Sequence, residues 1–280
     1  MTTETLATPQ RAAFDPYAPA PPTAPVHFLY RLNPLAKLAG PVPAMVLLVF
    51  VRDLATPLAF LALAYVLLLI GARVTWRTVG LLALGIPIAV LVLGFSLSLW
   101  TDVSRIDHSV VVLQVGGWAL YGEALATGFA TALRLAAILA LSLIPGLTTT
   151  GPDLVRSMIQ QLRVPYRIGY TAMTAFRFVP RFRHELETIR AAHRVRGAFG
   201  GRGPFSAIAR GFGYVVPLLA GAIRHAERVA LAMDARAFGA HPTRTERYAV
   251  PFRTRDAVFI ALFWVASATL FALWFPWGLT

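Results

Sequence analysis

Two short segments of the sequence carry an arginine in a similar setting. The first reads Val195-Arg196-Gly197 and the second reads Ala235-Arg236-Ala237, forty residues further along. A guanidinium group is rigid and permanently charged, so it binds carboxylates or backbone carbonyls in a fixed orientation. An arginine that only complemented a helix dipole would add about 0.3–1 kcal/mol of stability. Because the pattern occurs twice at comparable helix ends, it indicates a surface that docks another protein.

Long amphipathic helices are expected to lead up to both arginines. The first runs from about Tyr166 to Arg196, with an apolar stripe spaced by threes and fours and an interruption predicted at Pro180. The second runs from about Tyr214 to Arg236, and its stripe of small residues permits close helix crossing. The arginines are therefore expected at the tips of a pair of long helices.

A shorter helix is predicted just before this pair. Thr150 and Asp153 have the spacing of a capping box, which marks a helix start, and Pro165 is expected to stop the helix. Its apolar and polar residues fall on opposite sides, a pattern typical of a helix that lies along a membrane interface.

The composition assigns the rest of the chain to a membrane. Of 280 residues, 57% are hydrophobic and 14% are charged, whereas soluble domains carry about a quarter charged residues. Five apolar segments reach or approach the ~20 residues that cross a hydrocarbon core. They are Leu35–Val51, Thr56–Gly71, Thr78–Leu99, Gly122–Pro145 and Asp256–Trp277. We predict an all-α, polytopic integral membrane protein with about five transmembrane helices.

The basic charge is concentrated in one region. The net charge is +13, and residues 151–255 contribute +12 from 18 arginines and 6 acidic residues. Arginine massed between membrane segments is typical of a cytoplasmic region, so we place residues 151–255 and the amino terminus in the cytoplasm. A nucleic-acid partner is not expected, because the excess charge lies in a stretch flanked by spans.

Four regions follow from these patterns. Residues 1–33 are predicted to be a disordered Pro/Ala-rich cytoplasmic tail. Residues 34–150 hold the first four spans, residues 151–255 form a cytoplasmic region with the two long helices, and residues 256–280 form the last span. Arg134 lies midway along the fourth span, and we expect it to face the bundle interior, a water-filled cavity or a carboxylate such as Glu123.

Catalytic chemistry has little support in the sequence. There is no cysteine, and the single lysine, Lys37, lacks the glycine frame of a phosphate-binding loop. The six histidines form no close pair, and Glu227 with Asp234 are too few carboxylates for a magnesium site. We expect no catalytic residue, no cofactor and no metal site, so the energy for any transport must come from a partner. A self-sufficient secondary transporter stays an alternative, although the first four spans show no inverted repeat.

The sequence resembles the transmembrane T component of energy-coupling factor transporters over roughly residues 31–277. The resemblance rests on an ordered set of segments, which are Leu32–Leu38, Thr148–Leu154, Phe176–Arg181, Ala191–Gly197 and Ala230–Gly239.

The resemblance implies that the two long helices are crossed coupling helices whose tips dock on two cytoplasmic ABC ATPases. Carried over by position, the docking residues are Arg196 and Arg236 with their neighbours Val195, Gly197, Ala235 and Ala237. Two neighbours depart from the family pattern: Val195 replaces an alanine, and Ala237 replaces a glycine. Ala237 tolerates a left-handed cap less well than glycine, which leaves the second tip's geometry open.

The resemblance also implies the function. The chain would be a non-catalytic, multi-pass subunit in a bacterial plasma membrane, passing ATP-driven motion to a substrate-binding membrane subunit for uptake of a vitamin or a metal ion. Candidate contacts with that subunit lie around the expected kink and are Met173, Phe176, Phe178 and Pro180. The transported substrate cannot be read from this chain, because in this family the partner subunit binds it.

Overall fold

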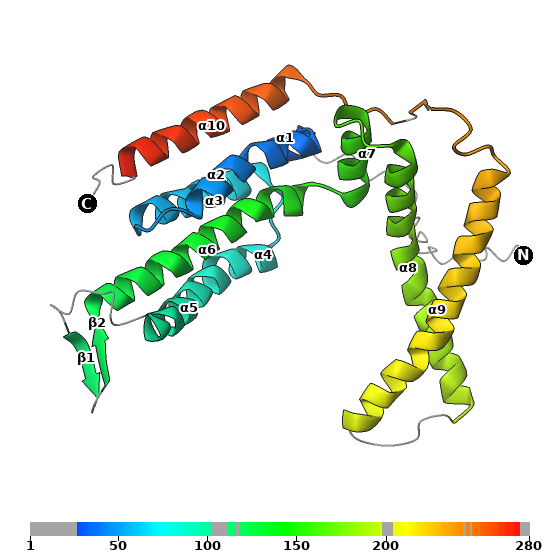
Figure 1. Ribbon diagram of the computed structural model, residues 1–280, viewed down its shortest axis with the longest axis horizontal. Coiled ribbons are helices and arrows are strands. Elements are labelled where there is room, and N and C mark those ends of the chain that lie inside the picture. The colour runs from blue at the N-terminus through cyan, green and yellow to red at the C-terminus, as the bar shows by residue number, and fades with distance from the viewer. Residues whose placement is uncertain are drawn as a thin grey trace, which may run out of the picture. The chain divides into compact units, whose positions relative to one another are not determined.

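A computed structural model of the chain describes residues 27–101, 111–115, 118–197, 204–242, 245–246 and 248–274. The chain divides into two compact units at the Ser157–Met158 and Ala249–Val250 boundaries. One unit, the bundle, comprises the described residues before Met158 and after Ala249. The other, the helix-pair unit, comprises the described residues from Met158 to Ala249. Figure 1 shows the helices of both units.

The apolar segments of the bundle are helical. Its elements are η1 (Phe28–Arg31), α1 (Pro34–Ala39), α2 (Pro41–Leu48), α3 (Ala55–Gly71), α4 (Trp76–Gly80), η2 (Leu81–Gly85), α5 (Ile86–Trp100), α6 (Gly122–Thr148) and α10 (Thr254–Trp274). Among the described helices, three are long and apolar enough to cross a membrane: Trp76–Trp100, Gly122–Thr148 and Thr254–Trp274. The apolar helices Pro34–Leu48 and Ala55–Gly71 are shorter. The all-α membrane fold is thus confirmed, while the count of five spans stays a prediction.

Two local features of the bundle differ from the sequence prediction. The segment predicted as a loop between spans contains a short hairpin, in which β1 (Val111–Val115) pairs antiparallel with β2 (Trp118–Tyr121). A valine-rich run opposite aromatic residues favours strands. The predicted tail lies outside the described residues as far as residue 26. Folded structure is present from η1 onward, earlier than the predicted boundary at residue 33, because Leu29 is fully buried.

Small residues bring α5 and α6 close together. A Cβ added at Gly128 would lie 2.7 Å from the carbonyl oxygen of Gly94 and would also collide with Ser98. Close approach of this kind is the usual basis of helix association in a membrane, where lipid is as apolar as the side chains.

A buried polar cluster joins α1, the end of α6 and the start of α10. The Lys37 ammonium group is 2% exposed and donates to the Thr148 carbonyl oxygen at 2.7 Å. The Asp256 carboxylate accepts hydrogen bonds from the backbone amides of Asn33, at 2.8 Å, and Arg253, at 2.7 Å. Buried polar groups need such partners, so these bonds fix three chain segments together.

Arg134 is half-buried and is held by backbone carbonyl oxygens of the bundle. Its Nη1 donates to the carbonyl oxygens of Val49, at 2.9 Å, and Val51, at 3.1 Å. Val49 and Val51 follow the end of α2, so no further turn of helix supplies backbone amides to their carbonyl oxygens. The expected alternative of a Glu123 pair is wrong, because eleven residues of helix separate the two by about 16 Å.

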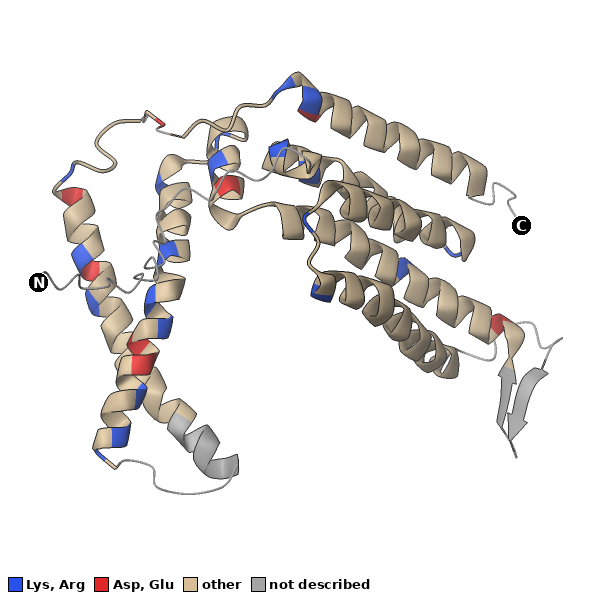
Figure 2. Cartoon of the chain, turned by 180° about the vertical axis from the view of Figure 1, so that it is seen from behind, with Lys and Arg blue, Asp and Glu red and all other residues tan. Residues whose placement is uncertain are grey.

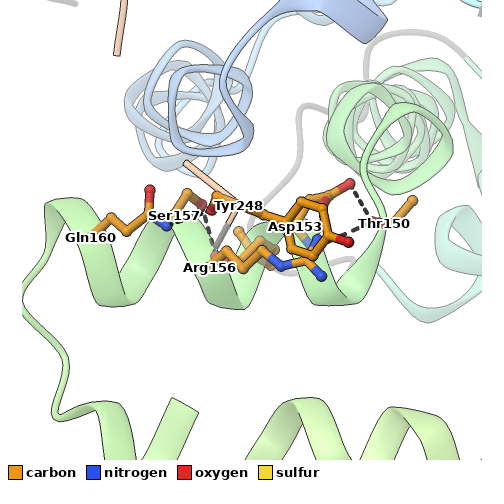
Figure 3. A network of polar contacts seen from close by, with 7 residues as sticks. Thr150, Asp153, Arg156, Ser157, Gln160 and Tyr248 are labelled. Atoms are coloured by element: carbon orange, nitrogen blue, oxygen red, sulfur yellow. Dashed lines mark hydrogen bonds and ion pairs between the residues drawn. The ribbon is translucent and has the colours of Figure 1, made fainter. Parts of the chain in front are cut away.

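The short helix α7 (Gly151–Gln161) begins where the capping box predicted. The Asp153 amide donates to the Thr150 hydroxyl at 3.3 Å, and that hydroxyl donates to the Asp153 carboxylate at 2.6 Å (Figure 3). Arg156 pairs with the same carboxylate at 2.7 Å. α7 ends at Gln161, four residues before Pro165, and Pro165 is the N-cap of the next helix.

Two long helices dominate the helix-pair unit: α8 (Tyr166–Val195) and α9 (Pro204–Asp234). They cross in Figure 1. α8 is continuous through Pro180, which removes one backbone donor, and the kink expected there stays a prediction. The start of α9 is ten residues earlier than predicted, although glycines weaken helix propensity in that stretch.

Candidate functional site

The first arginine end closes α8 as the sequence predicted. Arg196 is the C-cap, and its amide donates to the Ala192 carbonyl at 3.1 Å. Gly197 follows at φ +62°, the left-handed conformation that glycine adopts without strain, and its amide donates to the Arg194 carbonyl at 3.1 Å. The Val195 side chain is 90% exposed, and a Cβ at Gly197 would meet no atom within 4 Å. This end therefore projects freely from the described part of the chain.

The second arginine end has the same backbone geometry. The amide of Ala237 donates to the Asp234 carbonyl at 2.9 Å, and the amide of Phe238 donates to the Met233 carbonyl at 3.0 Å. These two bonds define a Schellman motif, with Arg236 at the C-cap and Ala237 left-handed at φ +54°. The alanine that replaces the family's glycine thus adopts the glycine conformation.

The surroundings of the second end differ from those of the first. The first turns of α8 contact the loop after Arg236 through Tyr166, Arg167 and Tyr170. No local pattern in the sequence marks these three residues, because they lie about 70 positions from the loop that they contact. A spacing of four, which puts both tyrosines on one helix face, was the only signal available.

A cavity of about 470 Å³ lies beside the second end. Its lining includes Arg177 and Arg236, with Met173 and the two tyrosines of α8. None of the described residues that line it is Asp or Glu. The cavity is therefore basic, and its walls are aromatic and thioether groups.

The four candidate contacts for a substrate-binding subunit do not share one face of α8. Phe176 and Pro180 are exposed, whereas Phe178 is half-buried against His225, with ring centroids 4.8 Å apart. Met173 is half-buried beside the cavity. Among the described residues, the predicted stripe of α8 is exposed around its middle, with Phe176 47% and Val179 52% exposed, whereas Leu186, Ile189 and His193 further along it are half-buried.

The crossing of α8 and α9 is polar at its centre. A Cβ at Gly221 would lie 3.0 Å from the Glu185 carboxylate, so glycine permits the close approach. Burial lowers the pKa of His225, and the positive charges of Arg181 and Arg228 lower it further against the opposing effect of Glu185. Figure 2 shows basic residues along both helices and acidic residues near the crossing. Within the described residues, no group of three His, Asp or Glu side chains could hold a metal ion.

Comparison with known proteins agrees with the sequence resemblance. Residues 25–246 match the family CbiQ, described as cobalt transport protein. The chain is 27% identical to the energy-coupling factor transporter transmembrane protein EcfT of Bacillus selenitireducens, over 89% of this chain and 94% of that protein. It is 31% identical to EcfT of Thermosediminibacter oceani, over 83% of this chain and 89% of that protein.

A relative of another kind is an ABC transporter ATP-binding protein of Bifidobacterium longum. It is 29% identical over 88% of this chain, which corresponds to 32% of that protein. The helical membrane bundle and the family match lead to the same conclusion. The chain belongs to the CbiQ cobalt transport protein family and is a transmembrane component of an energy-coupling factor transporter.

Proposed function

We propose that this chain couples ATP hydrolysis by two cytoplasmic ABC ATPases to a separate substrate-binding membrane subunit, for uptake of a vitamin or a metal ion. The chain itself is non-catalytic. It lies in a bacterial plasma membrane with its amino terminus and residues 151–255 in the cytoplasm. The ATPases grip Arg196 and Arg236 together with Val195, Gly197, Ala235 and Ala237.

The equivalence of the two arginine ends carries this proposal. Each arginine is the C-cap of a helix of about thirty residues, and each is followed by a left-handed residue, at φ +62° and +54°. One such end is an ordinary helix terminus, but two matched ends suit two copies of one kind of partner. The ATP-binding relative that contains a segment similar to this chain also supports an ATPase partner.

The chemistry of the ends favours an acidic partner surface. Arg236 borders a cavity that holds a second guanidinium, that of Arg177, and no acidic residue among its described lining. A partner carboxylate placed there would gain charge-assisted hydrogen bonds. Truncation of one partner in a buried charged contact costs about 2–5 kcal/mol, which is enough to detach an ATPase.

Uncovered apolar residues on α8 and α9 support a second partner, the substrate-binding subunit. Phe176 and Val179 on α8 and Leu219 and Ile223 on α9 are each about half exposed or more. Exposed apolar patches of this kind mark protein or membrane contacts. Because Phe176 and Pro180 are exposed while Met173 and Phe178 are not, we expect the first two to touch that subunit directly.

A double charge reversal, Arg196→Glu with Arg236→Glu, tests the ATPase docking. We expect the variant to insert into membranes normally but to lose ATPase co-purification and substrate uptake. The matched control, Arg183→Glu with Arg224→Glu, makes the same change in charge on the same two helices and should retain the ATPases. Unchanged co-purification of the double variant would refute the docking role. Gradient-driven uptake by the chain alone, without an ATPase, would instead establish a secondary transporter.

A further inference from the structure

The loop after Arg236 is held to the start of α8 by hydrogen bonds to its backbone. The Tyr166 hydroxyl donates to the His241 carbonyl oxygen at 2.6 Å, and the Arg167 guanidinium donates to the Gly239 carbonyl oxygen at 2.5 Å. A third bond reaches a side chain, because the Tyr170 hydroxyl donates to the Glu246 carboxylate at 2.8 Å. The first turns of α8 thus contact the loop at Gly239, His241 and Glu246.

Aromatic packing reinforces these bonds. The Phe238 ring meets the rings of Tyr166 and Tyr170 edge-on, with centroids 5.7 Å and 6.2 Å apart and interplanar angles of 76°. Edge-to-face pairs stabilise a contact beyond the area that they bury. Phe238 is two residues from Arg236, so its anchoring restricts where the arginine can project.

Gly239 is suited to this contact. Its φ is +93°, a conformation that residues with a side chain rarely adopt. A Cβ at this position would lie 3.2 Å from Nε of Arg167. The glycine therefore allows the guanidinium to reach the carbonyl oxygen.

Ala237 needs support from outside its own helix. A left-handed conformation is strained for an alanine, and such a residue persists only when surrounding contacts hold it. The bonds and rings described above fix the residues immediately after it. They compensate for the strain that glycine would not have had.

We propose that Tyr166, Arg167 and Tyr170 form a clamp that positions Arg236 for its partner and transmits movement of that end directly to the start of α8. The inference rests on the proposed function, because it assigns positioning residues to the second docking end. Movement applied at Arg236 reaches the first turn of α8 through these contacts, without passing through the helix crossing. The first end has no comparable clamp among the described residues.

Spin labelling gives a direct test, since the sequence contains no cysteine to remove. A nitroxide attached at Ala240→Cys reports the mobility of the clamped loop in the full chain, assembled with its ATPases and substrate subunit in liposomes. We expect an immobile label in the parent and in Arg167→Lys, which keeps a donor. In Arg167→Ala we expect about a tenfold larger mobile fraction, because a charge-assisted bond is lost. Arg183→Ala, an exposed residue further along the same helix, is the matched control.

Transport provides the second readout in the same samples. We expect Arg167→Ala to transport fewer substrate molecules per ATP hydrolysed, and Arg167→Lys to restore that ratio. A label that stays immobile in Arg167→Ala would overturn the clamp. A mobile label with an unchanged transport ratio would overturn the transmission of movement. If Arg236→Glu kept its ATPases, the docking proposal would fail, whereas the label would still report on the clamp.

Discussion

The two arginine ends share a backbone geometry but differ in what holds them. Arg196 and Arg236 occupy the same cap position, and a left-handed residue follows each. Among the described residues, the first end rests on Gly197, which adopts the left-handed conformation without strain, and its neighbour Val195 is 90% exposed. The second end uses an alanine and is held by α8 through contacts from residues about 70 positions away. Local sequence can therefore supply a cap at one end, while tertiary contacts supply it at the other.

Reversing the charge of each arginine singly should give the largest difference between the two ends, measured as the loss of ATPase binding. A partner that docks on a pre-positioned group loses less conformational entropy, so Arg236 should contribute more to binding than Arg196. We expect Arg236→Glu to weaken ATPase binding by about 2–5 kcal/mol and Arg196→Glu to weaken it less. Titration of each purified variant with the ATPases measures both losses. Equal losses would mean that the clamp gives Arg236 no advantage.

Exchanging alanine and glycine at the left-handed positions should change the stability of the two helix ends in opposite directions. Gly197→Ala places a strained alanine where none of the described residues forms a clamp, so we expect a loss of about 1 kcal/mol in the stability of that helix end. Ala237→Gly relieves strain, partly offset by chain entropy, so we expect a gain of about 0.4–1 kcal/mol. Hydrogen exchange of the last turn of each helix reports local stability. A destabilising Ala237→Gly would contradict the strain that we assign to this residue.

Removal of one hydroxyl should loosen only the second end. Tyr166→Phe keeps the ring against Phe238 but deletes the bond to the His241 carbonyl oxygen. We expect a loss of about 0.5–1.5 kcal/mol at the second end and none at the first. Hydrogen exchange at both ends measures the difference, and Tyr214→Phe, on α9 near the first end, serves as the control. A uniform loss at both ends would indicate a general loss of packing.

The sequence predicted the elements with local signals and missed those without them. Gly197 and the pair Thr150 and Asp153 marked the end of α8 and the start of α7. α9 starts ten residues before its predicted start, because the glycines in this stretch weaken the local helix signal without ending the helix.

The candidate functional site shows the same difference between features with a local sequence signal and features without one. Both arginine ends were visible as short motifs in the sequence. The clamp and the buried bond from Asn33 to Asp256, which joins residues 223 apart in sequence, required the fold. Periodicity in the sequence does not indicate which distant residues come into contact in the folded chain, so no sequence pattern marked these residues.

Lowering the pH slightly should reduce the stability of both helix ends equally, and this is the smallest of the expected effects. The pKa of His225 lies below its ordinary value of 6.5, because burial and the charges of Arg181 and Arg228 disfavour the protonated ring. Below pH 6.5 the unfolded chain binds a proton that the folded chain does not, so stability falls as the pH drops toward the folded pKa. Stability is fully retained above pH 6.5, the pKa of the histidine in the unfolded chain. Because His225 packs on Phe178 at the crossing and contacts neither end, this loss should loosen both ends equally.

Thermal unfolding of the detergent-solubilised chain between about pH 7.5 and pH 5.5 measures this dependence. His225→Phe keeps an aromatic ring against Phe178 but cannot take up a proton, so its unfolding temperature should fall less across the same range. Hydrogen exchange at the last turns of α8 and α9 then shows whether the two ends loosen together. If acid loosened only the clamped end, the loss would not come from the crossing, and the two ends would be coupled less closely than their shared crossing implies.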